Sequence, residues 1–287
     1  MRFLVLGASG MAGHMICSYL SEVGHDVTGV SRRHCPISSI RHVKANALDF
    51  SFLTGMIAGG NFDAIVNCIG ILNSDCDKSP TLAIRANAEL PHVIVDAARS
   101  IGTLVVQIST DCVFAGNTGP YTDSSLPDGS TLYDRTKALG EISGDGCLTL
   151  RQSIIGPDPN PEGIGLYNWF MNQDDCVKGY ERCIWTGLTT LELAKAVEKC
   201  TEVKASGLFN MVPSSSGLSK FKLLEMFNEL CRKRPIGIVP SDAIQIDKSL
   251  VPSSDMPYEP VGYHQQIEEM AAWISDHMSI YPHYRDR

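Results

Sequence analysis

The sequence lacks several features that mark particular classes of protein. Its ten cysteines include no Cys-x-x-Cys pair, so buried thiols are a better interpretation than zinc ligands or disulfides. No segment approaches the roughly 20 apolar residues that a membrane-spanning helix needs. No basic cluster exceeds Arg32-Arg33 or Arg232-Lys233-Arg234, and the formal net charge is -8. We therefore expect neither a membrane nor a nucleic acid as partner, and no carboxylate cluster indicates a metal.

Internal repeats and low-complexity tracts are also missing. A chain of 287 residues exceeds a typical single domain, so one large domain with an added lobe, or two domains, is expected. The apolar stretch up to Leu20 superficially resembles a signal peptide. Three spaced glycines and His14 interrupt it in a pattern with its own explanation, so we predict a cytoplasmic protein.

The N-terminus combines a short apolar strand with a glycine-rich turn. Residues 3–6 are followed at once by Gly7, Gly10 and Gly13 and by a helix expected to run to about Val23. Spaced glycines permit a tight turn, and a helix N-terminus offers free amides to a pyrophosphate. The spacing is G-x-x-G-x-x-G, not G-x-G-x-x-G. We predict a dinucleotide site here; the alternative is a turn with a structural role only.

The end of the second predicted strand, residues 26–30, indicates which dinucleotide is preferred. An acidic residue there would bind a ribose 2′-hydroxyl, but the chain has Ser31, Arg32 and Arg33. Two guanidiniums suit a 2′-phosphate, so NADP(H) is favoured over NAD(H). The arginines could instead be solvated loop charges. After a third strand at 42–45, Asp49 stands where an acid could accept from the adenine amino group.

The next strand and helix add three candidates. Residues 64–69 form a buried strand that ends at Gly70, where the backbone could pass close under a cofactor, whereas Cys68 is explained first by packing. A helix predicted from Ser79 to Ser100 carries Asn87 on its apolar stripe. A buried amide must be hydrogen-bonded, so Asn87 is either a structural tie or part of a polar path to the active site.

Proton-handling side chains gather after the strand at 104–108. Thr110 follows this strand, and Tyr133 and Lys137 lie four residues apart on a helix, so they share one face. A nearby cation favours an ionised phenol and would lower the pKa of the tyrosine. Such a group suits the protonation of a carbonyl. The alternative is that the Tyr-x-x-x-Lys spacing arose by chance, as it does in many helices, and that Lys137 simply pairs with Glu141 one turn later.

The alternation of strands and helices predicts the architecture. Up to a sixth strand at 148–155 it is typical of a doubly wound parallel sheet of the Rossmann type, with ligands beyond the carboxyl ends of the strands. Prolines and glycines from Gly156 onward then mark a change. We predict a dinucleotide-binding domain from residues 1–155 and about 187–212. A smaller, discontinuous substrate-binding lobe would comprise about 156–186 and 213–287, with a polar, proline-bearing passage from Pro240 to Pro260.

At this point the chain resembles the extended short-chain dehydrogenase/reductases, which have these motifs in the same order. Within that class it is most similar to the dTDP-4-dehydrorhamnose reductase family. Residues 109–116, S-T-D-C-V-F-A-G, resemble the S-T-D-Y-V-F-x-G segment of that family, and residues 207–212, G-L-F-N-M-V, resemble its G-L-Y-H-L-V strand.

The resemblance implies roles for these positions. Thr110 would hold the 4-keto oxygen of a nucleotide-linked sugar and Tyr133 would protonate it, while Lys137 would bind the nicotinamide ribose and lower the pKa of Tyr133. Asp111 would orient neighbouring groups. The remaining cofactor-binding residues are expected to be Gly7, Ser9, Gly10, Met11, Gly13, Ser31, Arg32, Arg33, Asp49, Phe50, Cys68, Gly70 and Asn87.

Departures from the family pattern leave the substrate open. The tryptophan that follows R-T-S in the rhamnose-forming enzymes is Ile154 here, and Trp185 could replace that ring. We predict substrate contacts for Trp185, Asn168 and Arg151. A UDP-linked 2-acetamido-4-keto-6-deoxy sugar is the alternative substrate, and an epimerase using Cys112 or a non-catalytic NADP-binding regulatory subunit are alternative functions. A homodimer also stays open.

Overall fold

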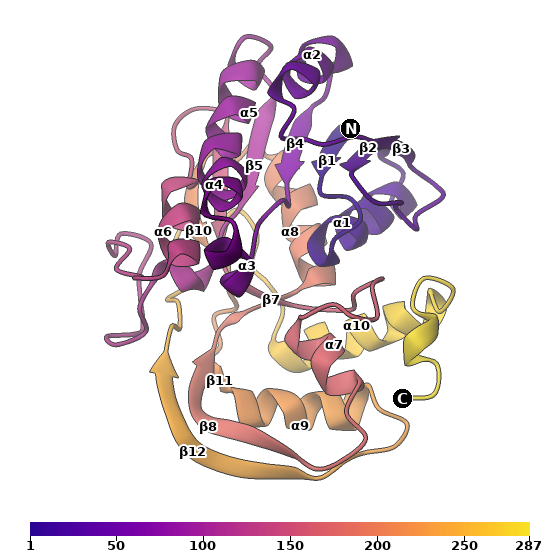
Figure 1. Ribbon diagram of the computed structural model, residues 1–287, viewed down its shortest axis with the longest axis vertical. Helices are drawn as coiled ribbons and strands as arrows, with labels where there is room; N and C mark the ends of the chain where they lie inside the picture. Colours follow the sequence, from indigo (N-terminus) through magenta and orange to yellow (C-terminus); the bar gives the residue numbers. More distant parts are fainter.

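A seven-stranded parallel sheet forms the upper half of the molecule in the computed structural model, which describes residues 1–287 (Figure 1). The strand order, β10-β6-β5-β4-β1-β2-β3, reverses direction between β1 and β4, so the sheet is doubly wound. The predicted fold class is therefore confirmed. The strands are β1 (Arg2–Leu6), β2 (Asp26–Ser31), β3 (Arg41–Lys44), β4 (Ala64–Asn67), β5 (Leu104–Ile108), β6 (Cys147–Arg151) and β10 (Gly207–Asn210).

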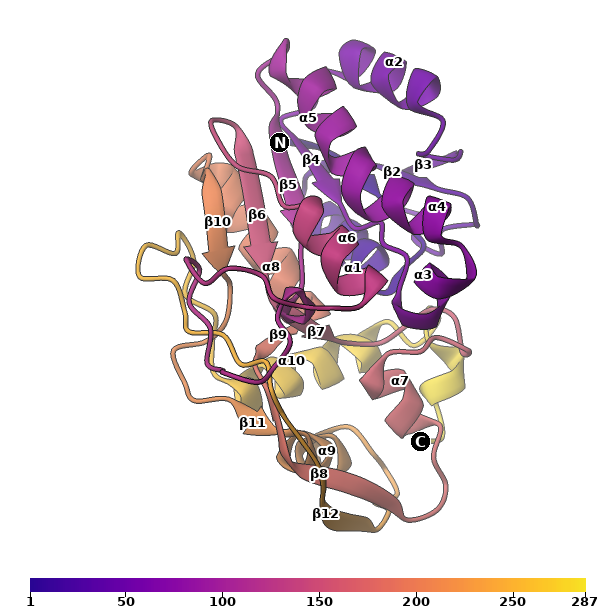
Figure 2. The same cartoon turned by 60° about the vertical axis from the view of Figure 1, so that its left-hand side comes forward.

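Helices cover both faces of this sheet (Figure 2). Side chains alternate along a strand, so in β1 Phe3 and Val5 face one apolar core while Leu4 and Leu6 face the other. Burial on both faces explains why the strands read as continuous apolar runs. Helices α1 (Met11–Glu22) and α8 (Thr190–Glu202) cover the first face, and α2 (Phe50–Gly60) and α5 (Leu90–Arg99) cover the second.

The helix predicted from Ser79 to Ser100 is broken into several pieces. A short α3 (Asn73–Lys78) precedes α4 (Pro80–Ala83), and a π-helical turn, η1 (Ile84–Glu89), separates α4 from α5. Proline lacks the N–H that would bond the carbonyl four residues earlier, so Pro91 leaves the carbonyl of Asn87 free of the α-helical pattern. The wider turn places Asn87, which is fully buried, against neighbouring segments.

Helix α6 (Leu132–Leu139) carries Tyr133 and Lys137 and begins with a capping box. The Thr131 hydroxyl accepts from the Asp134 amide at 3.1 Å, and the Asp134 carboxylate accepts from the Thr131 amide at 3.1 Å. These bonds satisfy amides that a helix start otherwise leaves unpaired, so they fix where the helix begins. The register of Tyr133 and Lys137 follows from that start.

The predicted sixth strand is two strands. β6 ends at Arg151, and β7 (Ser153–Ile155) leaves the large sheet to pair with β9 (Gly187–Thr189). These two short strands lie between the large sheet and the lower lobe (Figure 2).

The lower lobe has a three-stranded sheet and three helices. β12 begins two residues before the polar, proline-bearing passage expected from Pro240 to Pro260 and continues into it. It pairs in parallel with β8 along the sheet edge, where Pro240 is tolerated. The elements are α7 (Leu166–Met171), β8 (Val177–Trp185), β11 (Leu218–Ser219), α9 (Lys220–Leu230), β12 (Ile238–Asp247) and α10 (Tyr263–Asp276).

The lobe has its own apolar core, which is rich in aromatic rings. Tyr167 packs edge-on against Phe227, and Trp185 packs against Tyr263 with ring centroids 5.3 Å apart. The two-part division of the chain drawn from the sequence stays our prediction. No helix has both the length and the apolar character to cross a membrane. No group of three or more His, Cys, Asp or Glu side chains is placed to hold a metal ion.

Candidate active site

The glycine turn is shaped to bring backbone amides to a ligand. Gly7 has a φ of +87°, a conformation that glycine adopts without strain, and its amide donates to the Val30 carbonyl at 2.9 Å. A Cβ on Gly13 would lie 2.2 Å from the Gly7 carbonyl oxygen, so only glycine lets α1 pack this closely on the turn. No side chain caps α1 at Gly10, and its first turn contains no acid. Its N-terminal amides are therefore available to an anion.

A cavity of about 550 Å³ opens beside this turn. It joins the turn to the ends of β2 and β4, as expected for ligand binding at the carboxyl edge of a doubly wound sheet. Of the predicted cofactor-binding residues, eight line it: Gly7, Ser9, Gly10, Ser31, Arg32, Arg33, Cys68 and Gly70. The prediction missed Asn46, Ala47 and Leu48, which carry no motif of their own.

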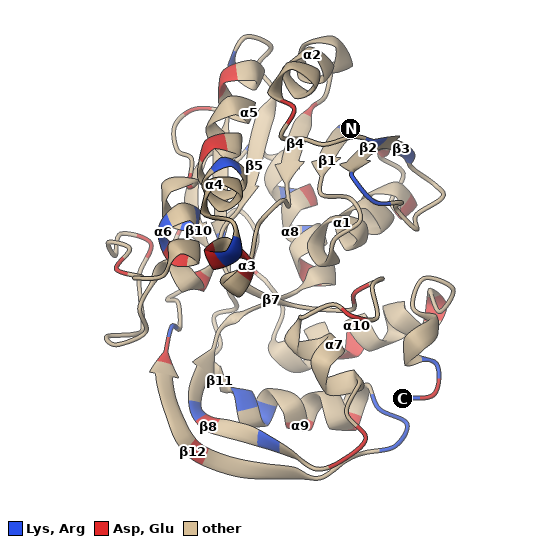
Figure 3. Cartoon of the chain, viewed as in Figure 1, with Lys and Arg blue, Asp and Glu red and all other residues tan.

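The basic pair is free to meet an anion. Arg32 and Arg33 are exposed and form no ion pair within the chain. Ser31 holds the loop that carries them, since its hydroxyl donates to the Arg33 carbonyl at 2.7 Å. Lys and Arg colour the segment that follows β2 in Figure 3. Two unpaired guanidiniums at the rim of the cavity remain consistent with a phosphate ligand.

Asp49 and Phe50 do not line the cavity. The Asp49 carboxylate accepts from the Phe52 amide at 3.2 Å and caps α2, and the guanidinium of Arg85 lies over the Phe50 ring at 4.9 Å. An aspartate that precedes a helix is explained by capping alone. The structure therefore gives both residues local roles, and the wall is formed by the segment just before them.

Asn87 is a tie between two segments of the site. Its side chain accepts from the Ile71 amide at 2.8 Å, and its amide group donates to the Ile71 carbonyl at 2.9 Å and to the Thr136 hydroxyl at 3.1 Å. Thr136 stands between Tyr133 and Lys137 on α6. Asn87 thus links the loop after β4, which lines the cavity, to the helix that carries the predicted catalytic groups.

Thr110 and Asp111 continue from the carboxyl end of β5. The Thr110 hydroxyl donates to the Asp111 carboxylate at 3.1 Å and accepts from the Cys112 amide at 3.1 Å. Burial raises the pKa of Asp111, while hydrogen bonds and the positive charges of Lys248 and Lys220 act in the opposite direction. Those two lysines lie in the lobe and were missed, because isolated lysines after a strand and at a helix start carry no distinguishing pattern.

Tyr133 faces the same point from α6. Its phenol lies near enough to Thr110 for that side chain to oppose the rise in the pKa of Tyr133. Burial is the main cause that raises the pKa of Tyr133 above its ordinary value, and the neighbouring Cys112 and Asp111 side chains also raise it. The expectation that Lys137 lowers this pKa is therefore wrong for this state of the molecule. The phenol stays protonated at neutral pH.

Lys137 is buried and turned to the end of β5. Its ammonium donates to the Ile108 carbonyl at 2.7 Å, so it does not form the simple ion pair with Glu141 that we considered. Burial lowers the pKa of Lys137 to about 8, against the attraction of Glu141 and Cys68. Cys68 lines the cavity, so this ammonium lies close to one of the cavity-lining residues.

Arg151 is committed to a buried ion pair. Its guanidinium donates to both carboxylate oxygens of Glu141, at 2.9 and 2.7 Å, and stacks over Phe114. The same carboxylate accepts from Ser109 at 2.7 Å. Arg151 is only 2% exposed, so its partners account for it without a substrate.

Asn168 and Trp185 are likewise engaged inside the lobe. The Asn168 amide group donates to the Pro161 and Gly163 carbonyls at 3.0 and 2.6 Å, and its carbonyl accepts from Tyr284 at 2.6 Å. Trp185 is 4% exposed and belongs to the aromatic core. The structure thus places most of the predicted cofactor-binding residues around one cavity and brings Thr110, Tyr133 and Lys137 to the end of β5, outside the lining of that cavity. It gives the three predicted substrate residues internal partners.

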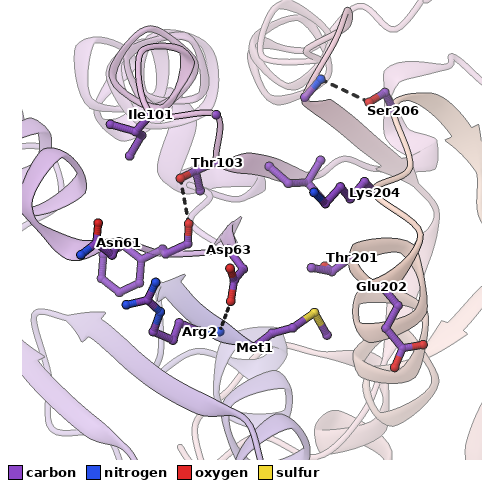
Figure 4. A pocket seen from close by; sticks show the side chains of 14 residues that line it. Met1, Arg2, Asn61, Asp63, Ile101, Thr103, Thr201, Glu202, Lys204 and Ser206 are labelled. Atoms are coloured by element: carbon purple, nitrogen blue, oxygen red, sulfur yellow. Dashed lines mark hydrogen bonds between the residues drawn. The ribbon is translucent and has the colours of Figure 1, made fainter.

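A second cavity of about 550 Å³ lies at the opposite edge of the sheet (Figure 4). It is lined by the start of β1, the segment before β4 and the end of α8, including Arg2, Asp63 and Lys204. These residues surround the amino ends of the strands. Ligands of doubly wound sheets bind at the carboxyl ends, and none of the predicted site residues lies here.

The fold and the site together define a member of the short-chain dehydrogenase/reductase class. A glycine turn opens the cavity, and Thr110, Tyr133 and Lys137 converge near the carboxyl end of β5. More specifically, the chain belongs to the family described as RmlD substrate binding domain, which matches residues 1–151. The predicted family is confirmed.

Individual relatives match about half of the chain. A dTDP-4-dehydrorhamnose reductase of Streptomyces griseus is 33% identical over 142 residues, which is 49% of this chain and 43% of that protein. The methionine adenosyltransferase 2 subunit beta of Xenopus laevis is 27% identical over 164 residues, 55% of this chain and 48% of that protein. The match therefore spans less than half the length of these curated relatives.

Solved structures match over nearly the whole chain. A hypothetical dTDP-4-dehydrorhamnose reductase from Sulfolobus tokodaii is 26% identical, with a TM-score of 0.74, and the match covers 87% of this chain and 92% of that one. The dTDP-4-dehydrorhamnose reductase of Bacillus anthracis in complex with NADP has a TM-score of 0.78 at 15% identity, covering 95% and 99%. At that identity the likeness concerns the fold alone.

Proposed function

We propose that the protein is an NADPH-dependent reductase of the 4-keto group of a nucleotide-linked 6-deoxyhexose, acting in the synthesis of surface-polysaccharide precursors. The observation that carries the proposal is the convergence of Thr110, Tyr133 and Lys137 at the carboxyl end of β5, where the Lys137 ammonium donates to the Ile108 carbonyl and the Tyr133 phenol lies close to Thr110. Two hydroxyls that converge beside a dinucleotide cavity suit the protonation of a carbonyl oxygen. The names of the Streptomyces griseus and Sulfolobus tokodaii relatives support the same reaction.

The residues present fit a nicotinamide dinucleotide. The close packing of Gly13 on Gly7 and the uncapped start of α1 make a cradle for a pyrophosphate. Arg32 and Arg33 would hold a 2′-phosphate, which favours NADPH, with NADH as the alternative. When bound, the dinucleotide supplies a hydride.

The side chains supply the proton. The raised pKa of Tyr133 keeps its phenol protonated, so it can donate to the carbonyl oxygen as that oxygen gains negative charge. The Thr110 hydroxyl would hold the same oxygen. Lys137, whose pKa is about 8, carries a positive charge at neutral pH, and we assign it to the nicotinamide ribose, as the resemblance implies. One proton from Tyr133 and one hydride convert the ketone to an alcohol.

Lysines of the lobe suit the rest of such a substrate. Lys220 and Lys248 act on Asp111 from the lobe side, so their positive charge faces the site. A nucleotide diphosphate is an anion that ammonium groups bind well. We assign the diphosphate to these two lysines in place of the internally bonded Arg151.

A panel of substrates tests the proposal. The protein is incubated with NADPH and with dTDP-, UDP- or GDP-linked 4-keto-6-deoxy sugars, including a 2-acetamido sugar, while nicotinamide absorbance is followed. Oxidation of NADPH with at least one sugar is expected. Tight binding of NADPH without oxidation by any of them would contradict the reductase.

That second outcome would favour a regulatory subunit. The resemblance to methionine adenosyltransferase 2 subunit beta is the observation behind this second candidate. An epimerase that uses Cys112 as its proton carrier has less support. Burial raises the pKa of the Cys112 thiol to about 12, so the thiolate that such a base requires is scarce at neutral pH.

A further inference from the structure

The C-terminal segment reaches back across the lobe to the glycine turn. We call residues 277–284, which follow α10 and include the turn η3 (Pro282–Tyr284), the C-terminal clasp. We call residues 156–165, which lead from β7 to α7, the crossing segment. In Figure 1 the crossing segment runs between α1 and α7, and the yellow C-terminal end of the chain lies beside α10 and α7. The clasp forms side-chain hydrogen bonds with α1 and with α7.

One end of the clasp is bonded to the helix of the glycine turn. His14, on the second turn of α1, is fully buried, and its Nε2 lies 2.7 Å from the Tyr281 hydroxyl. Its Nδ1 lies 3.0 Å from the Gly10 carbonyl oxygen. That oxygen can only accept, so Nδ1 carries the proton and Nε2 accepts from the tyrosine. Tyr281 thus fixes the imidazole that bonds the glycine turn.

The other end is bonded to the crossing segment. The Tyr284 hydroxyl donates to the Asn168 side-chain carbonyl at 2.6 Å and accepts from the Asp158 amide at 3.2 Å. The Asn168 amide group then donates to the carbonyls of Pro161 and Gly163. Asn168 therefore links Tyr284 to two points of the crossing segment. The centroids of the Tyr281 and Tyr284 rings lie 6.0 Å apart, with an angle of 29° between the ring planes, so the two ends also pack on each other.

The crossing segment lies against the predicted cofactor-binding residues. A Cβ on Gly165 would come within 2.9 Å of the Met11 sulfur, so the segment packs on the first residue of α1. Burial raises the pKa of Asp158, and the Arg33 guanidinium lies near enough to oppose that rise. The segment is thus in contact with the glycine turn at one end and near the basic pair at the other.

We propose that Tyr281 and Tyr284 are positioning residues for the dinucleotide: through His14 and Asn168 they hold the glycine turn and the crossing segment as one binding surface. The inference rests on the proposed function, because it concerns the dinucleotide site. It also assigns Asn168 a role in cofactor binding, in place of the substrate contact predicted from the sequence.

Variants that lose a single hydroxyl test this role. Tyr281→Phe and Tyr284→Phe keep the rings and remove one link each, and Tyr167→Phe is the matched control, since Tyr167 is a buried lobe tyrosine without a bond to either segment. The dissociation constant of NADPH should rise about fivefold in each clasp variant and stay unchanged in the control. In turnover assays the KM for NADPH should rise while kcat at saturation is kept.

Two further measurements separate positioning from general stability. His14→Leu removes the acceptor of Tyr281, so adding Tyr281→Phe should weaken NADPH binding no further. Hydrogen exchange of residues 156–165 should become faster in Tyr284→Phe but not in Tyr167→Phe.

The possible failures are distinguishable. If the unaltered protein binds NADPH but both clasp variants bind it equally well, the clasp inference is overturned and the proposed function stands. If it binds NADPH and the clasp variants behave as expected but no sugar is reduced, the reductase fails and the clasp stands. If it binds neither NADPH nor NADH, both are overturned.

Discussion

The dinucleotide half and the lobe use their polar residues in opposite ways. Around the glycine turn, the uncapped amides of α1 and the guanidiniums of Arg32 and Arg33 are left without partners in the chain and face a cavity. In the lobe, Asn168 is bonded on both sides and Trp185 is packed in the core. An unpaired polar group next to a cavity indicates a ligand, whereas a satisfied one indicates architecture.

The largest expected effect is on the glycine turn. Gly13→Ala places a Cβ 2.2 Å from the Gly7 carbonyl oxygen, so the turn must open. NADPH binding should weaken on the order of 1000-fold, about 4 kcal/mol. Gly59→Ala in α2 is the control, because a Cβ there meets nothing within 4 Å. It should leave binding unchanged and raise the free energy of unfolding by about 0.5 kcal/mol. Equal titration curves for the two variants would remove the turn from the dinucleotide site.

The second largest effect is expected on stability, from the buried ion pair between Arg151 and Glu141. Glu141→Gln leaves the guanidinium short of a counter-charge and should lower the free energy of unfolding in urea by roughly 2 to 3 kcal/mol. The KM for the sugar nucleotide should stay the same in protein that remains folded. A raised KM for the sugar nucleotide with an unchanged free energy of unfolding would contradict this account and indicate that Arg151 contacts the substrate.

A smaller effect is expected on the pH dependence of the free energy of unfolding, through His14. Burial lowers the pKa of His14 to about 4, below its ordinary value of 6.5, so the unfolded chain binds this proton first as the pH falls. The stabilisation is complete above pH 6.5 and is lost progressively down to pH 4. Urea unfolding at pH 5 should show about 2 kcal/mol less stability from this group than at pH 8. His14→Leu should remove that difference, and an undiminished slope in the variant would assign it to other groups.

The smallest effect concerns the choice of cofactor. Arg32→Ala should weaken NADPH roughly tenfold, because a charge-assisted bond to the 2′-phosphate is lost, and should leave NADH unaffected. Isothermal titration with both dinucleotides measures the difference. An equal loss for NADPH and NADH would defeat the assignment of the phosphate.

The sequence was informative where function depends on the backbone. Gly7 and Gly13 occupy positions that other residues cannot fill, and Tyr133 and Lys137 share a helix face by spacing alone, so both groups could be found without coordinates. The pKa shifts and hydrogen-bond partners of Tyr133 and Lys137 could not be predicted from the sequence. The pKa of Tyr133 depends on burial and on Asp111 and Cys112, and Lys137 bonds the Ile108 carbonyl, a partner distant in sequence.

In the lobe, contacts between residues far apart in the sequence limited the prediction. The engagement of Asn168 depends on Tyr284, 116 residues later, and nothing local indicates that contact. β12 was missed because Pro240, Ser241 and Asp242 break its apolar pattern, so that apolar and polar residues alternate only over residues 244–247. Asp49 was assigned to adenine because a cap and a ligand-binding carboxylate look alike in a sequence.

The central claim is that Tyr133 protonates a carbonyl beside a bound dinucleotide, and Tyr133→Phe tests it most directly. The measurement is the rate of NADPH oxidation with the best sugar of the panel, together with the NADPH dissociation constant of the same preparation. We predict a loss of about 100-fold or more in turnover, with NADPH binding retained. Turnover equal to that of the unaltered protein would contradict the account.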